Sequence, residues 1–219
     1  ERDVEAVRAI DGVDWVAPDA SIPATQVMYD NDTVTGGTGF GVFRVVASSP
    51  ERFNTDLFNM TEGEPFDQPD EAVVNQQFVK LFDGGLAVGD QVTTSFANGN
   101  RTTFTVSGIV DDDTGGQTSP RIIVPLDPHY RTTVTLPDGS QQRAFSGIIL
   151  SAESFDRVEE VRDEVDAYFQ NDSDAKELKQ EEHTIAVQTV QDAIDQFTAI
   201  IDQLALFLGG IAGIALVVG

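Results

Sequence analysis

The sequence predicts an α+β fold, in which a few short helices accompany many short β-strands. Apolar residues recur at helical spacing in 2–10 and 151–169, near the two ends of the chain. Short apolar or alternating runs, bounded by turn residues, fill the stretch between them. The dipeptides Asn98-Gly99 and Asp138-Gly139 each separate two such runs, which is a strong signal for a β-hairpin.

Each predicted element follows from its local pattern. Helices are expected at 2–10, 50–58, 76–82 and 151–169, the last with the apolar face Phe155, Val158, Val161, Val165 and Tyr168. Strands are expected at 13–17, 22–29, 40–47, 71–75, 91–96, 102–110, 122–125, 132–136, 141 onward, 144–150 and 183–188. The segments 30–39 and 63–70 are interpreted as polar loops. The outer segments therefore form a split β-α-β pattern, and the middle of the chain is a β-rich insertion.

The charge of the chain is strongly negative and spread along its length. The sequence contains 37 acidic and 13 basic residues, for a net charge of −24. Phosphate binding needs a basic surface, so nucleic acid is not expected as a partner. Only three cations are lysines, and the self-repulsion of such a chain is screened at about 1 M salt, where the Debye length is about 3 Å. We interpret this composition as that of a halophilic protein. The alternative, a dedicated binder of a cation or of a cationic peptide, predicts local acid clusters, of which only 111–113 and 181–182 are found.

The end of the sequence predicts a membrane segment. From Leu204 to Gly219 no residue has a polar side chain, and sixteen residues approach the roughly 20 that a full span requires. We therefore expect the start of a truncated transmembrane helix, with a buried core helix as the alternative. Gly209 and Gly213 form a GxxxG pattern, which allows close packing between membrane helices.

A stalk helix is expected to lead into that segment. Its apolar residues recur at alternating spacings of four and three, which is typical of a heptad seam. The seam residues are Val190, Ile194, Phe197, Ile201, Leu204 and Leu208. The expected partner of the seam is a second membrane tether preceding Glu1, and packing on the chain's own domain is the alternative.

Motifs for catalysis, cofactors or metals are absent from the sequence. It has no phosphate-binding GxxxxGK[ST], no GxSxG, no HExxH and no cysteine. His129 and His183 are isolated and are interpreted as surface or packing residues. The run from Asp111 resembles the start of a calcium loop, but its twelfth position is Ile122, where a bidentate Glu is needed. We therefore predict neither an enzyme nor a cofactor or metal site.

Four Asn-x-Ser/Thr motifs are candidate N-glycosylation acceptors. They lie at Asn31, Asn59, Asn100 and Asn171.

The order of several segments resembles a known family. These segments are 45–53 (VVASSPERF), 62–66 (EGEPF), 72–75 (AVVN), 78–82, 88–90 (VGD), 104–110 (FTVSGIV), 123–126 (IVPL) and 207–212 (FLGGIA). In this order they resemble the periplasmic core domain of MacB-type ABC transporter permeases, which adjoins an FtsX-like membrane part. With the halophilic composition, we expect the source to be a halophilic archaeon. The likeness covers nearly the whole chain.

This resemblance implies an architecture and a function. It implies a porter-like subdomain from 1–48 and 143–190, an inserted sabre-like β-rich subdomain from 49–142, and a stalk entering the membrane over 190–219. It also implies a domain on the extracellular face of the cell membrane, in a dimeric permease of four membrane helices per copy.

The family couples to a separate cytoplasmic ABC ATPase and transmits its movement outward. Its substrates include peptides, antibiotics and lipoproteins. An archaeon lacks an outer membrane, so the adaptor and duct of Gram-negative relatives are not expected. The alternative function is a tethered extracellular sensor or adhesion ectodomain.

Overall fold

The computed structural model of the chain describes residues 2–35, 43–53, 58–83, 85–111, 119–126, 132–135, 141–145, 147–171 and 189. The chain forms two compact units. The first consists of Glu1–Ala9 and Val13–Ser151, and the second of Ile10–Gly12 and Ala152–Gly219. The subdivision into 1–48 with 143–190 and 49–142, which the family resemblance implies, stays a prediction.

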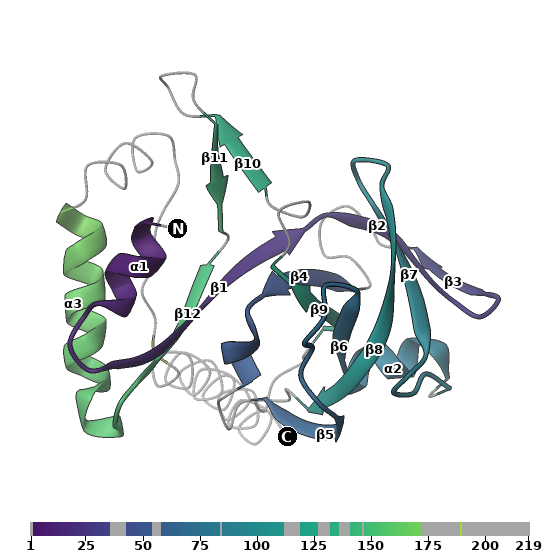
Figure 1. Cartoon of the computed structure of the whole chain (residues 1–219), viewed down its shortest axis with the longest axis horizontal. Coiled ribbons are helices and arrows are strands. Elements are labelled where there is room, and N and C mark those ends of the chain that lie inside the picture. The colour runs from purple at the N-terminus through teal and green to yellow at the C-terminus, as the bar shows by residue number, and fades with distance from the viewer. Residues whose placement is uncertain are drawn as a thin grey trace, which may run out of the picture. The chain divides into compact units, whose positions relative to one another are not determined.

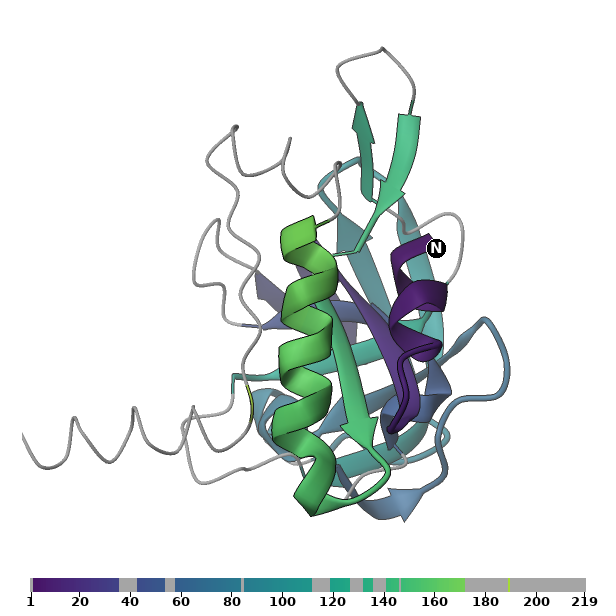
Figure 2. The ribbon, with the colours of Figure 1, turned by 90° about the vertical axis from the view of Figure 1, so that its left-hand side faces the viewer.

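Helices are few and mostly short. The α-helices are α1 (Arg2–Arg8), α2 (Gln76–Val79) and α3 (Val158–Asn171), and the 3₁₀ turns are η1 (Pro50–Phe53), η2 (Lys80–Phe82) and η4 (Phe155–Arg157). Figure 2 shows α3 as one unbroken helix. The short α2 begins where the side chain of Asn75 accepts a hydrogen bond from the backbone N–H of Phe78 at 2.9 Å. Helical structure ends at Asp83, which adopts the left-handed conformation.

Among the described residues, ten strands form one mixed sheet (Figure 1). Its strands are β1 (Val13–Ile22), β2 (Ala24–Tyr29), β3 (Asp32–Thr35), β4 (Arg44–Ser48), β5 (Asn59–Gly63), β6 (Glu71–Asn75), β7 (Gln91–Phe96), β8 (Arg101–Asp111), β9 (Arg121–Pro125) and β12 (Gly147–Ala152). Their order is β12-β1-β4-β9-β6-β8-β7-β2-β3, with β5 paired to β8. The pairs β4·β9 and β6·β8 are parallel. A separate two-stranded sheet consists of β10 (Thr132–Thr135) and β11 (Gln141–Ala144).

The sheet curves back on itself in the first unit. Only Pro23 separates β1 from β2, yet these strands are the second and the eighth in the order of the sheet. Consecutive strands joined by one residue must lie close together, so the intervening strands curl around a common interior. A bulge between Ala24 and Gln26 assists this bend. The predicted end of the first strand at residue 17 was wrong, because β1 runs through Pro18 and ends at Ile22.

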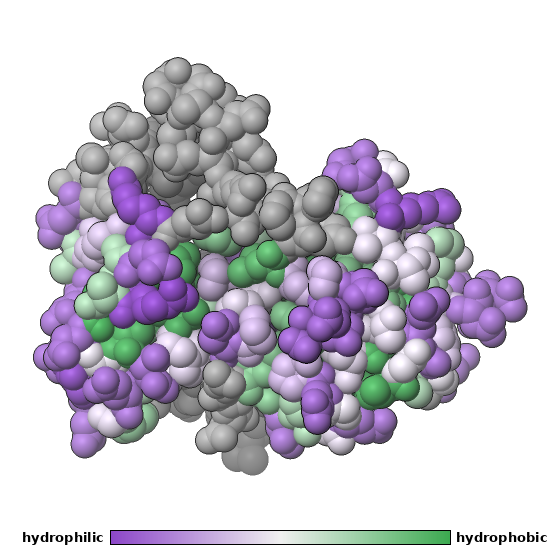
Figure 3. Space-filling view, in the orientation of Figure 1, coloured by the Kyte–Doolittle hydropathy of each residue, from purple (hydrophilic) through white to green (hydrophobic). Residues whose placement is uncertain are grey.

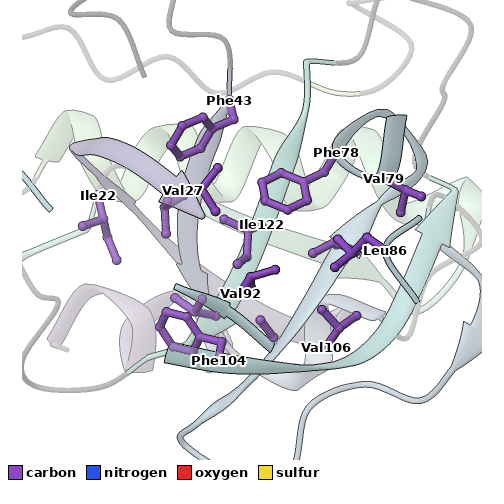
Figure 4. Close-up of a cluster of buried hydrophobic side chains, with 14 of the residues drawn as sticks. Ile22, Val27, Phe43, Phe78, Val79, Leu86, Val92, Phe104, Val106 and Ile122 are labelled. Carbon is purple, nitrogen blue, oxygen red and sulfur yellow. The ribbon is translucent and has the colours of Figure 1, made fainter. Parts of the chain in front are cut away.

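The interior of the curved sheet is the main hydrophobic core. Buried side chains from seven strands and from α2 converge there (Figure 4). They include Ile22, Val27, Phe43, Phe78, Val79, Leu86, Val92, Phe104, Val106 and Ile122. The rings of Phe43, Phe78 and Phe82 meet edge to face within this core.

A second, smaller core lies on the opposite face of the sheet. Phe53, Phe58 and Phe66 pack there against apolar residues of β6, β8 and β9. Successive residues of a strand point to opposite faces, so Val73 enters this core whereas Val74 enters the main one. Burial on both faces explains why these strands are continuous apolar runs rather than alternating ones.

Several other boundaries differ from the prediction. The predicted polar loop 30–39 contains β3, which pairs with β2 across the two-residue turn Asp30-Asn31. The structure also adds β5, whose sequence has no alternating apolar pattern. The helix predicted from residue 151 begins as η4 at Phe155, and the Phe155 side chain is 85% exposed instead of lying on an apolar face. Val161 and Val165 of the predicted face are buried.

The hairpins and the β6–α2 unit are confirmed. Strand β6 has the predicted bounds, and β7 with β8 forms the hairpin predicted at Asn98-Gly99. The predicted strand at 183–188 lies outside the described residues. In the described part of the chain, no helix has the length and apolar character needed to cross a membrane.

Candidate functional site

The candidate site is a junction in the second unit, where residues 10–12 meet the start of α3. The chain reaches residues 10–12 directly after its first helix, and it reaches residues 153–160 as it enters its last described helix. The backbone N–H of Glu153 donates to the carbonyl of Gly12 at 2.8 Å. Two segments that are far apart in sequence are thus joined at the main chain.

Arg157 is the centre of this junction. Its Nη2 donates to Asp11 Oδ2 at 2.7 Å and to the Asp11 carbonyl at 3.4 Å. Its Nε donates to Glu160 Oε2 at 3.1 Å, and Nη1 lies 3.8 Å from Glu153 Oε2. A guanidinium presents its donors in a rigid planar fork, so one side chain can hold several acceptors in a fixed geometry.

Gly12 makes room for this guanidinium. A Cβ atom at residue 12 would lie 2.6 Å from Arg157 Cζ, closer than side-chain atoms pack. Gly12 also has φ +86°, in the left-handed region that favours glycine. The Asp11-Gly12 turn therefore supplies both a carboxylate and a space for the Arg157 side chain.

The surroundings of Arg157 stabilise the charged form of its guanidinium. The hydrogen bond to Asp11, followed by that to Glu160, raises the pKa of Arg157 further above its already high ordinary value. The charged guanidinium and the carboxylates around it therefore attach residues 10–12 to the segment 153–160.

A second charged constellation lies in the first unit and is buried. Arg52 of η1 pairs with Asp19 of β1, and Asp19 also accepts a hydrogen bond from the Ser48 hydroxyl of β4. The side chains of Arg52 and Asp19 are only 4% and 18% exposed. The guanidinium also lies over the ring of Phe58, 4.5 Å from its centroid. This pair fixes η1 to two strands and supports the second core.

The predicted acceptor asparagines lie on the surface. Asn31 is in the β2–β3 turn, Asn59 is in β5, Asn100 precedes β8, and Asn171 ends α3, and all four are exposed. The seam residues from Val190 to Leu208, Gly209, Gly213, His129 and His183 lie outside the described residues. Of the candidate calcium loop, Asp111 ends β8, and Asp112 and Asp113 lie outside the described residues.

Neither a metal site nor a deep pocket is found in the part of the chain that the structure describes. No group of three or more His, Asp or Glu side chains there could hold a metal ion. The second unit has an open, shallow depression lined by Ile10, Glu164, Ala167, Tyr168 and Asn171. It lacks the enclosed walls of a small-molecule site.

The family relationship follows from the sequence match. Residues 1–168 match the model of the MacB-like periplasmic core domain. The chain belongs to this family. The MacB-like domain is a periplasmic or extracellular, non-catalytic part of an ABC transporter permease, a kind of transporter that works with an ATPase. This membership favours the permease over the tethered sensor or adhesion ectodomain.

Solved structures are similar to this MacB-like domain, and the periplasmic region of MacB shares its fold. The periplasmic region of MacB from Actinobacillus actinomycetemcomitans is 14% identical with a TM-score of 0.52, over 84% of this chain and 83% of that one. The extracellular domain of the noncanonic ABC-type transporter YknZ from Gram-positive bacteria is 14% identical with a TM-score of 0.49, over 74% and 76%. A domain of a putative permease protein from Porphyromonas gingivalis is 10% identical with a TM-score of 0.48, over 76% and 68%. None of the curated proteins compared with the chain matches it.

Sequence reasoning did not find the two charged constellations. Arg157 and Asp11 are 146 positions apart, and Asp19 lies between two predicted strands whereas Arg52 lies in the predicted helix 50–58. The available signals in the sequence were the scarcity of basic residues and the Asp11-Gly12 dipeptide, which follows the predicted helix 2–10 and is typical of a helix end. Each of thirteen basic residues among 37 acids has many candidate partners, so the pairing itself required the fold.

Proposed function

We propose that this MacB-like domain transmits ATP-driven movement from the membrane part of the permease to the extracellular side. The observation that carries the proposal is the Arg157 junction. It attaches the segment that follows the first helix to the segment that begins the last described helix. If the two ends of the chain are connected to two membrane helices, a displacement of one stalk reaches the other through this attachment.

The ATPase, the second permease copy and the membrane helices belong to the same proposal. The ATPase is a separate cytoplasmic ABC subunit, and the permease is a dimer. The seam from Val190 to Leu208 pairs with a helix preceding Glu1, and Leu204–Gly219 begins a span in which Gly209 and Gly213 pack against a neighbouring helix. The movement serves export or release of a substrate such as a peptide, a lipoprotein or an antibiotic.

The experiment is a distance measurement in the complete transporter, reconstituted with its ATPase. Residues 1–219 contain no cysteine, and any cysteine elsewhere in the transporter is replaced, so that Gln68→Cys, at an exposed position, gives one spin label per copy and one distance per dimer. Pulsed electron resonance is recorded without nucleotide and after trapping with ATP and vanadate. We expect the distance distribution to shift on trapping, and Arg157→Gln to reduce that shift.

The matched control removes a nearby arginine, Arg162, which lies in α3. Arg162 contacts Glu159 and Asp163 on exposed turns of α3, so Arg162→Gln should leave the shift intact. An unchanged distance distribution on trapping would show that the domain does not move with ATP turnover. If the distance distribution of the Arg157→Gln variant shifts as far as that of the unmodified protein, the junction does not transmit the movement.

We also propose a halophilic source, on the basis of the net charge of −24. The repulsion among these charges weakens as the Debye length falls from about 10 Å at 0.1 M salt to about 3 Å at 1 M. Thermal melting of the domain should therefore give a higher Tm at 1 M than at 0.1 M KCl. A Tm that is highest in low salt contradicts this proposal.

N-glycosylation of Asn31, Asn59, Asn100 and Asn171 is a further proposal, supported by their exposed positions. Asn59 is the least accessible to a modifying enzyme, because its strand β5 is paired with β8 and the Thr61 hydroxyl donates to the Ile109 carbonyl at 3.1 Å. The intact mass of protein purified from its native membrane tests this directly, and a mass equal to that of the bare chain rejects it.

A further inference from the structure

One face of the main sheet carries no acidic side chain across four neighbouring strands. These strands are β3, β2, β7 and β8. Their register places the residues of one side in rows, namely Thr35, Gln26, Ser95 and Arg101, then Thr33, Met28, Thr93 and Thr103, then Gln91 and Thr105. Among these ten residues Ser95 is buried, and the other nine are exposed or half-buried. We call these ten residues the neutral face. It is the side of the strands opposite the main core, because Val27, Val92 and Phe104, which alternate with them, are buried in that core.

The side chains of the neutral face are polar except for Met28, and almost all are uncharged. The hydroxyls of Thr93 and Thr103 are 2.8 Å apart across the strands, which confirms that these two side chains share one side of the sheet. Arg101 carries the only charge among the ten residues. Figure 3 shows pale residues of intermediate hydropathy over these strands at the right, between strongly hydrophilic hairpin tips.

This neutrality contrasts with the rest of the molecule. The chain has 37 acidic residues among 219, about one in six, and acidic residues favour exposed positions. The α3 surface shows the general pattern, with exposed Glu159, Glu160, Asp163 and Glu164 in consecutive turns. On the sheet, Glu71 of β6 borders the neutral face beside Thr105 and marks where it ends.

We propose that the neutral face is a contact surface between two copies of this chain. Two copies, each with a net charge of −24, repel one another wherever acidic surfaces approach. The neutral face is a place where that repulsion is smallest. This inference rests on the proposed function, in which two permease copies share one membrane.

The chemistry of the neutral face also suits contact with itself. A two-fold interface brings the same patch of both copies together, so the patch must be self-complementary. Carboxylates only accept hydrogen bonds, and two carboxylate surfaces therefore have nothing to exchange. Threonine hydroxyls and glutamine amides both donate and accept, so Thr33, Thr103 and Gln26 of one copy find partners in the same residues of the other.

The size of the face predicts a transient contact. With strands about 4.8 Å apart, four strands and three rows of side chains cover on the order of 300 Å². A stable interface buries about 800 Å² on each partner. Two copies tethered side by side in one membrane reach a high effective concentration, at which a weak contact still forms and can open during a transport cycle.

Cysteine cross-linking in the full-length permease, in its membrane, tests this inference. A short bis-maleimide is added to Thr103→Cys and, as a matched control away from the face, to Gln68→Cys. We expect a covalent product with the mass of two chains from Thr103→Cys and little from Gln68→Cys. Adding the isosteric changes Gln26→Glu and Gln91→Glu to Thr103→Cys should lower the yield of the cross-linked dimer roughly fivefold. This factor corresponds to the repulsion between two like charges about 4 Å apart in water.

Two further measurements separate repulsion from damage to the fold. Gln68→Glu in the Thr103→Cys background adds a charge elsewhere and should leave the yield unchanged. Salt near 1 M should restore the yield of the Gln26→Glu and Gln91→Glu variant, which unfolding would not allow.

The outcomes distinguish this inference from the proposed function. If Gln68→Cys gives a cross-linked dimer and Thr103→Cys does not, the permease is still a dimer, but the neutral face is not its contact surface. The absence of any dimer from either position counts against both. If Thr103→Cys is cross-linked to a different protein, that protein and not a second copy of the chain contacts the neutral face, and the inference is overturned.

Discussion

Arg157 Nη2 donates a hydrogen bond of 2.7 Å to Asp11 Oδ2, which joins two residues that are 146 positions apart. The pair, with Glu153 and Glu160 around it, attaches residues 10–12 to the segment 153–160 of the same unit. This attachment gives the first prediction.

Arg157→Gln should destabilise the domain more than Arg162→Gln. The first change removes donors to the side chain and carbonyl of Asp11, whereas Arg162 pairs with Glu159 and Asp163 of its own helix. Thermal melting at 0.1 M and 1 M salt measures the difference, which should shrink at high salt because the ion pairs are partly exposed. Equal Tm values for both variants at low salt would show that the junction does not stabilise the domain.

Asp19→Leu should cost roughly 3 kcal/mol or more of unfolding free energy, because it leaves the buried Arg52 without its counter-ion. The double variant Asp19→Leu with Arg52→Met removes both charges and should be more stable than Asp19→Leu alone. Urea denaturation of the single and double variants gives the comparison. A double variant less stable than Asp19→Leu alone would mean that Arg52 is held by contacts other than Asp19, such as the Phe58 ring.

Gly108→Ala should destabilise the sheet where β5 pairs with β8. A Cβ atom there would lie 2.6 Å from the Glu64 carbonyl oxygen and would also collide with the end of Met60. Relieving such a clash costs about 1–3 kcal/mol. Gly147→Ala is the control, because its Cβ would meet no atom within 4 Å. Urea midpoints that fall equally for the two variants would exclude close packing as the cause.

The phenol of Tyr29 should make stability fall at alkaline pH. Tyr29 Oη lies 2.7 Å from Asp90 Oδ2 and 2.9 Å from the Gly85 carbonyl, and donation to Asp90 raises the Tyr29 pKa above its ordinary 10.0. A raised pKa means that the protonated form is the stabilising one. Its contribution is complete below pH 10.0 and is lost as the pH rises through the folded pKa.

The check is a series of melting curves between neutral pH and the alkaline range. Tyr29→Phe should flatten the alkaline decline and lower stability at neutral pH, since the Asp90 carboxylate loses a donor. A spectroscopic titration of tyrosinate should show one late-titrating tyrosine that is missing in Tyr29→Phe. An alkaline decline that is identical in both proteins would assign it to other groups.

Local sequence patterns determined much of the secondary structure. The Asn98-Gly99 turn and the flanking β-branched residues specify the β7–β8 hairpin, because turn geometry and strand propensity act over a few residues. The bounds of β6 and the start of α2 follow from Asn75, whose side chain caps the helix after an apolar run. Strand β5 was missed because its residues are mostly exposed and are held by pairing with β8.

The sequence by itself also determined the composition that defines this protein, a net charge of −24 with no catalytic motif, and the ordered segments that mark its family. Only the tertiary structure decided which residues meet. The partner of Arg157, the bend at Pro23 and the alignment of Thr33, Met28, Thr93 and Thr103 into one row depend on contacts between distant segments. Such contacts are chosen by the packing of the whole sheet, which a local pattern of a few residues does not contain.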